Sequence, residues 1–120
     1  MEDFKAMLRI LAAVYAREKA NGGLEYLDER IVKTDDKTRD ILLMKLQKQG
    51  YIEGLHIVES VDGQRVPVIL WQDSFPTVTF SGMQFMDGNE TAKAVLREIK
   101  DAAVSLAAQT FGTIIAGQIK

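Results

Sequence analysis

The feature that most constrains this chain is the junction LQKQGYIEG at residues 46–54. Leu, Gln and Lys are good helix formers, and Gly50 suits the left-handed conformation that ends many helices. Tyr51 and Ile52 follow at once, and aromatic and β-branched residues favour an extended chain. The junction therefore predicts a helix that passes into a strand without a linker.

Hydrophobic periodicity predicts three helices up to this junction. Apolar residues recur at three- and four-residue intervals over residues 3–20, and a pair of glycines then ends the pattern. The segment LEYLDERI, residues 24–31, predicts a short second helix. Asp35 and Asp36 can accept hydrogen bonds from unpaired helix amides, so they predict a third helix from about 37 to 49.

After the junction the pattern becomes that of strands. Residues 55–71, LHIVESVDGQRVPVILW, are rich in Val and Ile, and Asp62-Gly63 at their centre is a strong hairpin signal. Pro67 cannot donate a ladder hydrogen bond, which places its strand at an edge or a bulge. We expect a two-stranded ribbon, with Trp71 anchoring its end against the core.

Two further helices are predicted after the ribbon. Thr79 can cap the first, and the second begins near Glu90. Residues 102–119 carry no charge and reach the length of a membrane helix, but several polar residues dilute them. We expect a packed helix there, because small residues at four-residue intervals would let another helix approach closely.

The order helix, short helix, helix, ribbon is that of a winged helix-turn-helix. A chain of 120 residues can bury one hydrophobic core and is too short for two ordinary domains. We therefore expect one α+β domain over residues 1–120, with a three-helix core and a two-stranded β-wing. The core would span about 3–88, and additional C-terminal helices would form an extension over about 90–120.

Two segments, LQKQGYIEGLHI and VTFSGMQFMDGN, resemble the YjcQ family of small winged-helix proteins from bacterial and phage genomes. The shared pattern is a helix-Gly-Tyr-Ile junction and a later Thr-x-x-Gly-x-x-aromatic helix start with an Asn soon after. Its positions here are Gly50, Tyr51, Ile52, Thr79, Gly82, Phe85 and Asn89. The resemblance covers roughly residues 4–105 and implies a winged-helix fold and, by analogy, nucleic-acid binding. It implies no catalytic residue.

Composition narrows the chemistry. The net charge is −2, so no global positive field holds a polyanion, and any nucleic-acid contact would be local. The chain has no Cys and a single His, His56, so we expect no disulfide, no metal and no cofactor. No nucleophile elbow or phosphate-binding glycine loop is present in the sequence. We expect no enzymatic activity and no small-molecule substrate.

The N-terminal stretch MEDFKAMLRI has no basic flank leading into a long apolar run. It therefore lacks the pattern of a secretory signal. We expect a cytoplasmic protein without membrane attachment.

The predicted third helix carries the candidate contacts to double-stranded DNA. Its basic and amide side chains could contact phosphates and base edges in the major groove. They are Lys37, Arg39, Lys45, Gln47 and Lys48. The acidic pair before this helix, Asp35 and Asp36, would repel phosphates unless both carboxylates are engaged as helix caps. The competing interpretation is an ordinary solvated helix face.

The predicted wing is less favourable to DNA. Residues 51–89 contain five acidic residues and one Arg, Arg65. A wing that contacts the DNA backbone should be basic. Arg65 is the only wing contact that we expect.

A protein-interaction module on the same scaffold is the alternative function. Met83, Met86, the last helix and its tail supply more apolar side chains than a compact core needs. This surplus would mediate a homodimer through the C-terminal helix, or the tail would fold back over the first helix. In a dimer, two reader helices would lie about one DNA turn apart.

Overall fold

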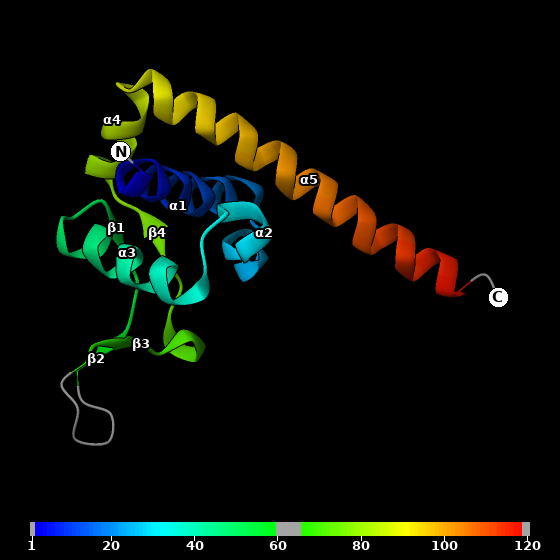
Figure 1. Cartoon of the computed structure of the whole chain (residues 1–120), viewed down its shortest axis with the longest axis horizontal. Coiled ribbons are helices and arrows are strands. Elements are labelled where there is room, and N and C mark those ends of the chain that lie inside the picture. The colour runs from blue at the N-terminus through cyan, green and yellow to red at the C-terminus, as the bar shows by residue number, and fades with distance from the viewer. Residues whose placement is uncertain (1, 60–65, 119–120) are drawn as a thin grey trace.

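The computed structural model describes the backbone of residues 2–59 and 66–118, and the side chains of residues 4–59 and 66–105. Its elements form an α+β arrangement, as expected (Figure 1). In chain order they are α1 (Glu2–Ala20), the 3-10 turn η1 (Leu24–Leu27), α2 (Glu29–Val32), α3 (Asp36–Lys48), β1 (Ile52–Glu53), β2 (Ile57–Val58), β3 (Val68–Ile69), the 3-10 turn η2 (Trp71–Asp73), β4 (Thr77–Val78), α4 (Phe80–Asp87) and α5 (Glu90–Gln118).

The predicted helix over residues 24–31 is in fact two short pieces, η1 and α2. Asp28 between them is extended, with φ −61° and ψ 144°, and its carboxylate accepts a hydrogen bond from the Arg30 amide at 2.8 Å. Asp side chains that bond to the nearby backbone compete with a continuing helix. The prediction of one continuous helix was wrong for this reason.

The junction after α3 has the predicted conformation. Gly50 is left-handed, with φ +84°. The Gly50 amide donates to Gln47 O at 3.0 Å, and the Tyr51 amide donates to Leu46 O at 3.0 Å. These two bonds form the Schellman motif that closes a helix. Ile52 is then buried, so the helix ends and the core strand begins within three residues.

The four strands form two separate antiparallel pairs. In the predicted ribbon, Ile57 of β2 faces Ile69 of β3. Pro67 directly precedes β3, and the predicted Asp62-Gly63 turn lies outside the described residues. In the second pair, Ile52 of β1 faces Val78 of β4, which the sequence pattern did not predict.

Helix α1 is the centre of the molecule. It contacts α3 and β4 on one side and α5 on the other (Figure 1). Its residues Ile10, Leu11 and Val14 are almost fully buried. Burial of such apolar side chains is the main favourable contribution to folding. The predicted starts of the last two helices are confirmed, since Thr79 accepts a hydrogen bond from the Gly82 amide and α5 begins at Glu90.

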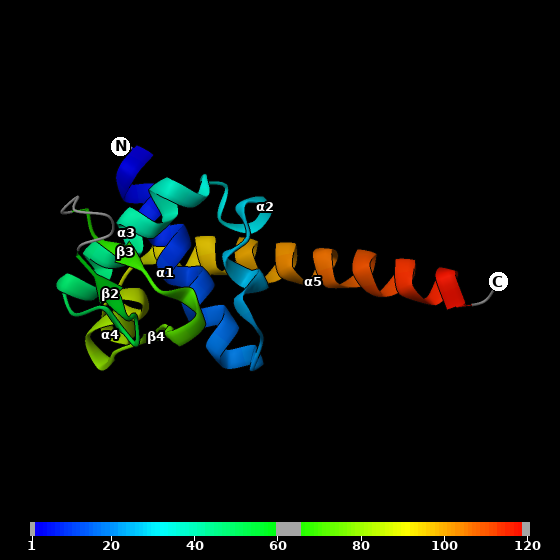
Figure 2. The same ribbon diagram turned by 90° about the horizontal axis from the view of Figure 1, so that it is seen from below.

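Helix α5 has two parts. Up to Ala103 it packs on α1 and α2, with Val95, Ile99 and Ala103 buried. Beyond that point its backbone continues away from the other elements, as Figures 1 and 2 show from two directions. Among the residues that the structure describes, no helix combines the length and apolarity needed to cross a bilayer.

Candidate nucleic-acid interface

One face of α3 carries basic side chains in solvent. Lys37, Lys45 and Lys48 are all exposed, while Leu43 and Leu46 on the opposite face are buried. Separations of three, eight and eleven residues bring the three lysines to the same side of the helix. Within the described residues, none of the three lysines has an acidic partner within 4.0 Å.

Arg39, in contrast, is held inside the molecule. Its side chain is only 14% exposed, and its Nη1 donates to Leu27 O and to Asp36 Oδ1, both at 3.1 Å. Its Nε donates to Asp40 Oδ1 at 2.9 Å, and the guanidinium carbon lies 5.2 Å from the centroid of the Trp71 ring. Arg39 therefore fastens the start of α3 to η1 and to the base of the ribbon.

Gln47 is also engaged within the chain. Its Nε2 donates to Leu55 O at 3.1 Å, and its Oε1 accepts from the Leu55 amide at 2.8 Å. This pair of bonds ties the segment between β1 and β2 to the end of α3. Gln47 thus sets the position of the ribbon relative to the exposed face of α3.

Helical spacing could have identified both of these residues as structural. Arg39 lies three and four residues before Leu42 and Leu43, and Gln47 lies four residues after Leu43. Both positions border the buried leucine stripe of α3. The same spacing places Ile41 among the lysines, at 43% exposure, which the sequence interpretation missed.

The acidic side chains at the start of α3 have partners. Asp35 Oδ2 accepts a hydrogen bond from the Thr38 amide at 3.2 Å. Hydrogen bonding from the Thr38 side chain first, and from its amide second, lowers the pKa of the Asp35 carboxyl. Asp36 is the first helical residue, and its carboxylate pairs with Arg39. Asp35 therefore serves as the predicted cap, and the ion pair offsets the charge of Asp36.

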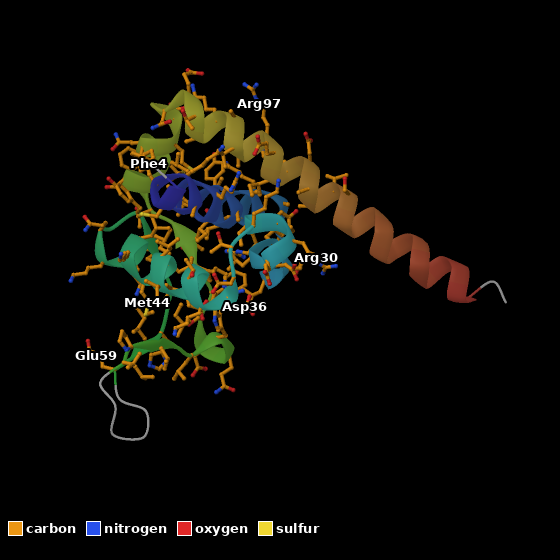
Figure 3. The ribbon with its side chains drawn as sticks, in the orientation of Figure 1. Phe4, Arg30, Asp36, Met44, Glu59 and Arg97 are labelled. Atoms are coloured by element: carbon orange, nitrogen blue, oxygen red, sulfur yellow. The ribbon has the colours of Figure 1, made fainter. Side chains whose placement is uncertain are left out.

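The ribbon adds no described cation to this interface. Arg65 lies outside the described residues. The described ribbon residues 55–59 and 66–70 contain no Lys or Arg. They contain one acidic residue, Glu59, which Figure 3 shows at the end of β2. His56 Nδ1 at the ribbon base lies 3.7 Å from Asp73 Oδ2, and both side chains are largely exposed.

Trp71 lies at the end of the ribbon, as expected. Its Nε1 donates to Asp40 Oδ2 at 3.4 Å, and the residue packs partly buried against the core. At the described positions, no group of three or more His, Asp and Glu side chains could hold a metal ion.

Comparison with known proteins gives a family match. The model of a family described as YjcQ protein matches residues 6–103. This range contains α3, both strand pairs, α4 and the part of α5 that packs on α1. Neither the curated proteins nor the solved structures gave a match.

Proposed function

The chain belongs to the YjcQ family, and from this premise we propose that it is a winged-helix protein that binds double-stranded DNA. In this proposal α1, α2 and α3 are the three-helix core, and the β2–β3 ribbon is the wing. The protein would act as a phage or bacterial transcriptional regulator in the cytoplasm, where the DNA is. It would have no catalytic activity.

The exposed lysine face of α3 is the observation that carries the proposal. Lys45 and Lys48 lie in solvent, and α5 packs on the other side of α1 from α3 (Figure 1). A recognition helix must project from the body to enter the major groove, which is wide enough for one α-helix. The outward face of α3 meets this requirement.

In the proposed complex, α3 enters the major groove and its lysines contact phosphates. Phosphate contacts fix orientation and supply salt-dependent affinity. Arg39 and Gln47 act as positioning residues, because their side chains are already bonded to Leu27 and Leu55. Arg65 remains the proposed wing contact. No bond is made or broken in this mechanism.

Fluorescence anisotropy with a random-sequence duplex tests the proposal across a salt series. We expect weak binding at low salt that falls as salt rises. The variant Lys45→Glu, Lys48→Glu should lose roughly tenfold or more in affinity, and its salt slope should fall by about two.

A matched control keeps the charge change and moves it to α5. Arg97 and Lys100 are exposed on that helix, so Arg97→Glu, Lys100→Glu should bind DNA nearly as the parent does. Far-UV circular dichroism checks that both variants are folded. Equal losses in the two variants, or no parent binding at low salt, would contradict the proposal.

The free part of α5 favours a second function, self-association. From residue 102 to 119 the sequence contains no charged side chain, and α5 runs clear of the body there (Figure 2). A single helix of this length is marginally stable in water without packing. A homodimer through this segment would supply the packing. It would also serve the alternative role as an interaction module.

A further inference from the structure

We propose that Ile41 recognises thymine by contacting the C5-methyl group of that base, an inference that rests on the proposed DNA binding. Ile41 is 43% exposed, in the middle of the face of α3 that also carries Lys37, Lys45 and Lys48. It lies four residues from both Lys37 and Lys45. An apolar side chain thus occupies the place on α3 that faces the base edges when the lysines contact phosphates.

Met44 extends this apolar position toward the ribbon. It lies three residues after Ile41 and is half-buried, and Figure 3 shows it on the side of α3 nearer β2. Thr38, three residues before Ile41, is exposed and also carries a methyl group. Together Thr38, Ile41 and Met44 form an apolar strip along the helix, bordered by cationic side chains. This combination suits a major groove in which thymine methyl groups lie between two phosphate backbones.

The hydrogen-bonding side chains of α3 leave few other ways to read bases. In the major groove, Arg or Lys bonds to guanine and Asn or Gln bonds to adenine. Arg39 and Gln47 have their polar atoms engaged with Leu27, Asp36, Asp40 and Leu55. Among the four bases only thymine presents a methyl group in the major groove. The exposed side chain of Ile41 can therefore distinguish thymine from the other bases.

A duplex pair that differs only in this methyl group provides the test. The first duplex has a central run of A·T pairs, and the second has deoxyuridine in place of every thymine. Watson–Crick pairing and phosphate charge are the same in both. We expect the parent to bind the thymine duplex about fourfold tighter for each methyl group that it buries.

Two variants assign the effect to Ile41. Ile41→Ser should bind the two duplexes equally and keep the salt slope of the parent, because the lysines remain. Ile41→Val, which keeps a branched apolar surface, should retain most of the preference. Since Ile41 lies at the surface with 43% exposure and outside the buried core, both variants should fold, and thermal denaturation followed by circular dichroism verifies this.

Methylation of cytosine gives an independent readout. A G·C duplex with 5-methylcytosine presents a methyl group at the equivalent position, so the parent should prefer it to the unmethylated duplex.

Equal parent affinity for the thymine and deoxyuridine duplexes, with a normal salt slope, would overturn the role of Ile41 and leave DNA binding intact. A preference that persists in Ile41→Ser would do the same. Absence of binding to every duplex at low salt would instead refute the proposed function itself.

Discussion

At the scale of single residues, Arg17 shows how a buried charge can hold two distant segments together. Its side chain is 1% exposed, Nη2 donates to Pro76 O, and the guanidinium carbon lies 4.0 Å from the centroid of the Phe75 ring. Its Nε has no hydrogen-bond partner among the described residues, and burial lowers the pKa of the guanidinium. The next residue, Glu18, accepts from the Val78 amide at 2.8 Å. Together they fasten the end of α1 to β4.

Replacement of Arg17 should separate the loss of the bonds from the loss of volume. Arg17→Ala leaves Pro76 O unpaired and opens a cavity beneath Phe75, so we expect it to lower the free energy of unfolding by about 2–3 kcal/mol. Arg17→Met fills most of the space and removes a poorly solvated charge, so its loss should be clearly smaller. Urea denaturation measures both. Equal losses would show that packing volume contributes little at this position.

At the scale of elements, α3 is defined by local signals at each end and by long-range bonds between them. Asp35 caps its start and Gly50 closes its end. Arg39 and Gln47 then attach it to η1 and to the segment before β2. The element therefore presents one rigid face while its polar inner residues determine its position. We expect substitution of Asp35 to change how the free energy of unfolding depends on pH.

The Asp35 cap predicts a specific pH dependence. Hydrogen bonding from Thr38, from its side chain first and from its amide second, lowers the pKa of the folded Asp35 carboxyl below its unfolded value near 4. Its stabilisation is therefore present above pH 4 and is lost as the pH falls through the folded pKa. Asn is also a good cap but does not titrate. Asp35→Asn should lose less stability than the parent between pH 6 and pH 3 in urea denaturation. An equal loss would assign the acid sensitivity to other carboxylates.

The sequence predicted those elements whose signals are local. The junction at Gly50, the cap at Thr79 and the start of α5 depend on neighbouring residues, and all three are confirmed. The pairing of β1 with β4 could not be predicted, because two-residue strands 25 residues apart carry no measurable periodicity. It depends on tertiary contacts with α1.

The candidate site was predictable only in part. The lysines of α3 are exposed, whereas Arg39 and Gln47 form hydrogen bonds within the chain. Residue type alone does not distinguish these uses, since Arg and Gln can bond equally well to DNA or to a backbone carbonyl. The difference becomes visible only when each residue is placed relative to the leucine stripe. Ile41 was missed because it begins an apolar run, residues 41–44, in which Leu42 and Leu43 are buried.

At the scale of the whole molecule, α1 separates two surfaces with different chemistry. The lysine face of α3 lies on one side, and α5 lies on the other and extends beyond the body (Figure 2). The described chain measures 51 × 40 × 25 Å along its principal axes. A dimer through the free part of α5 would therefore leave both α3 faces open to DNA. Binding of one duplex by two α3 helices would raise affinity through effective concentration.

The dimer predicts a mass that depends on the last residues of the chain. One chain has a mass of 13.4 kDa. In size-exclusion chromatography with light scattering, we expect the parent to have twice this mass. A variant that ends after Ser105 keeps the buried part of α5 and should be monomeric. Circular dichroism should show that this variant is folded. A parent that is monomeric at micromolar concentration would contradict self-association through α5.

The central claim, that the outward face of α3 contacts DNA, is tested most directly by nuclear magnetic resonance. A titration of the ¹⁵N-labelled chain with a short duplex at low salt follows each backbone amide. We expect the largest shift changes on residues 37–48 and small changes along residues 90–105. Changes confined to α4 or α5, with α3 unaffected at saturating duplex, would contradict it.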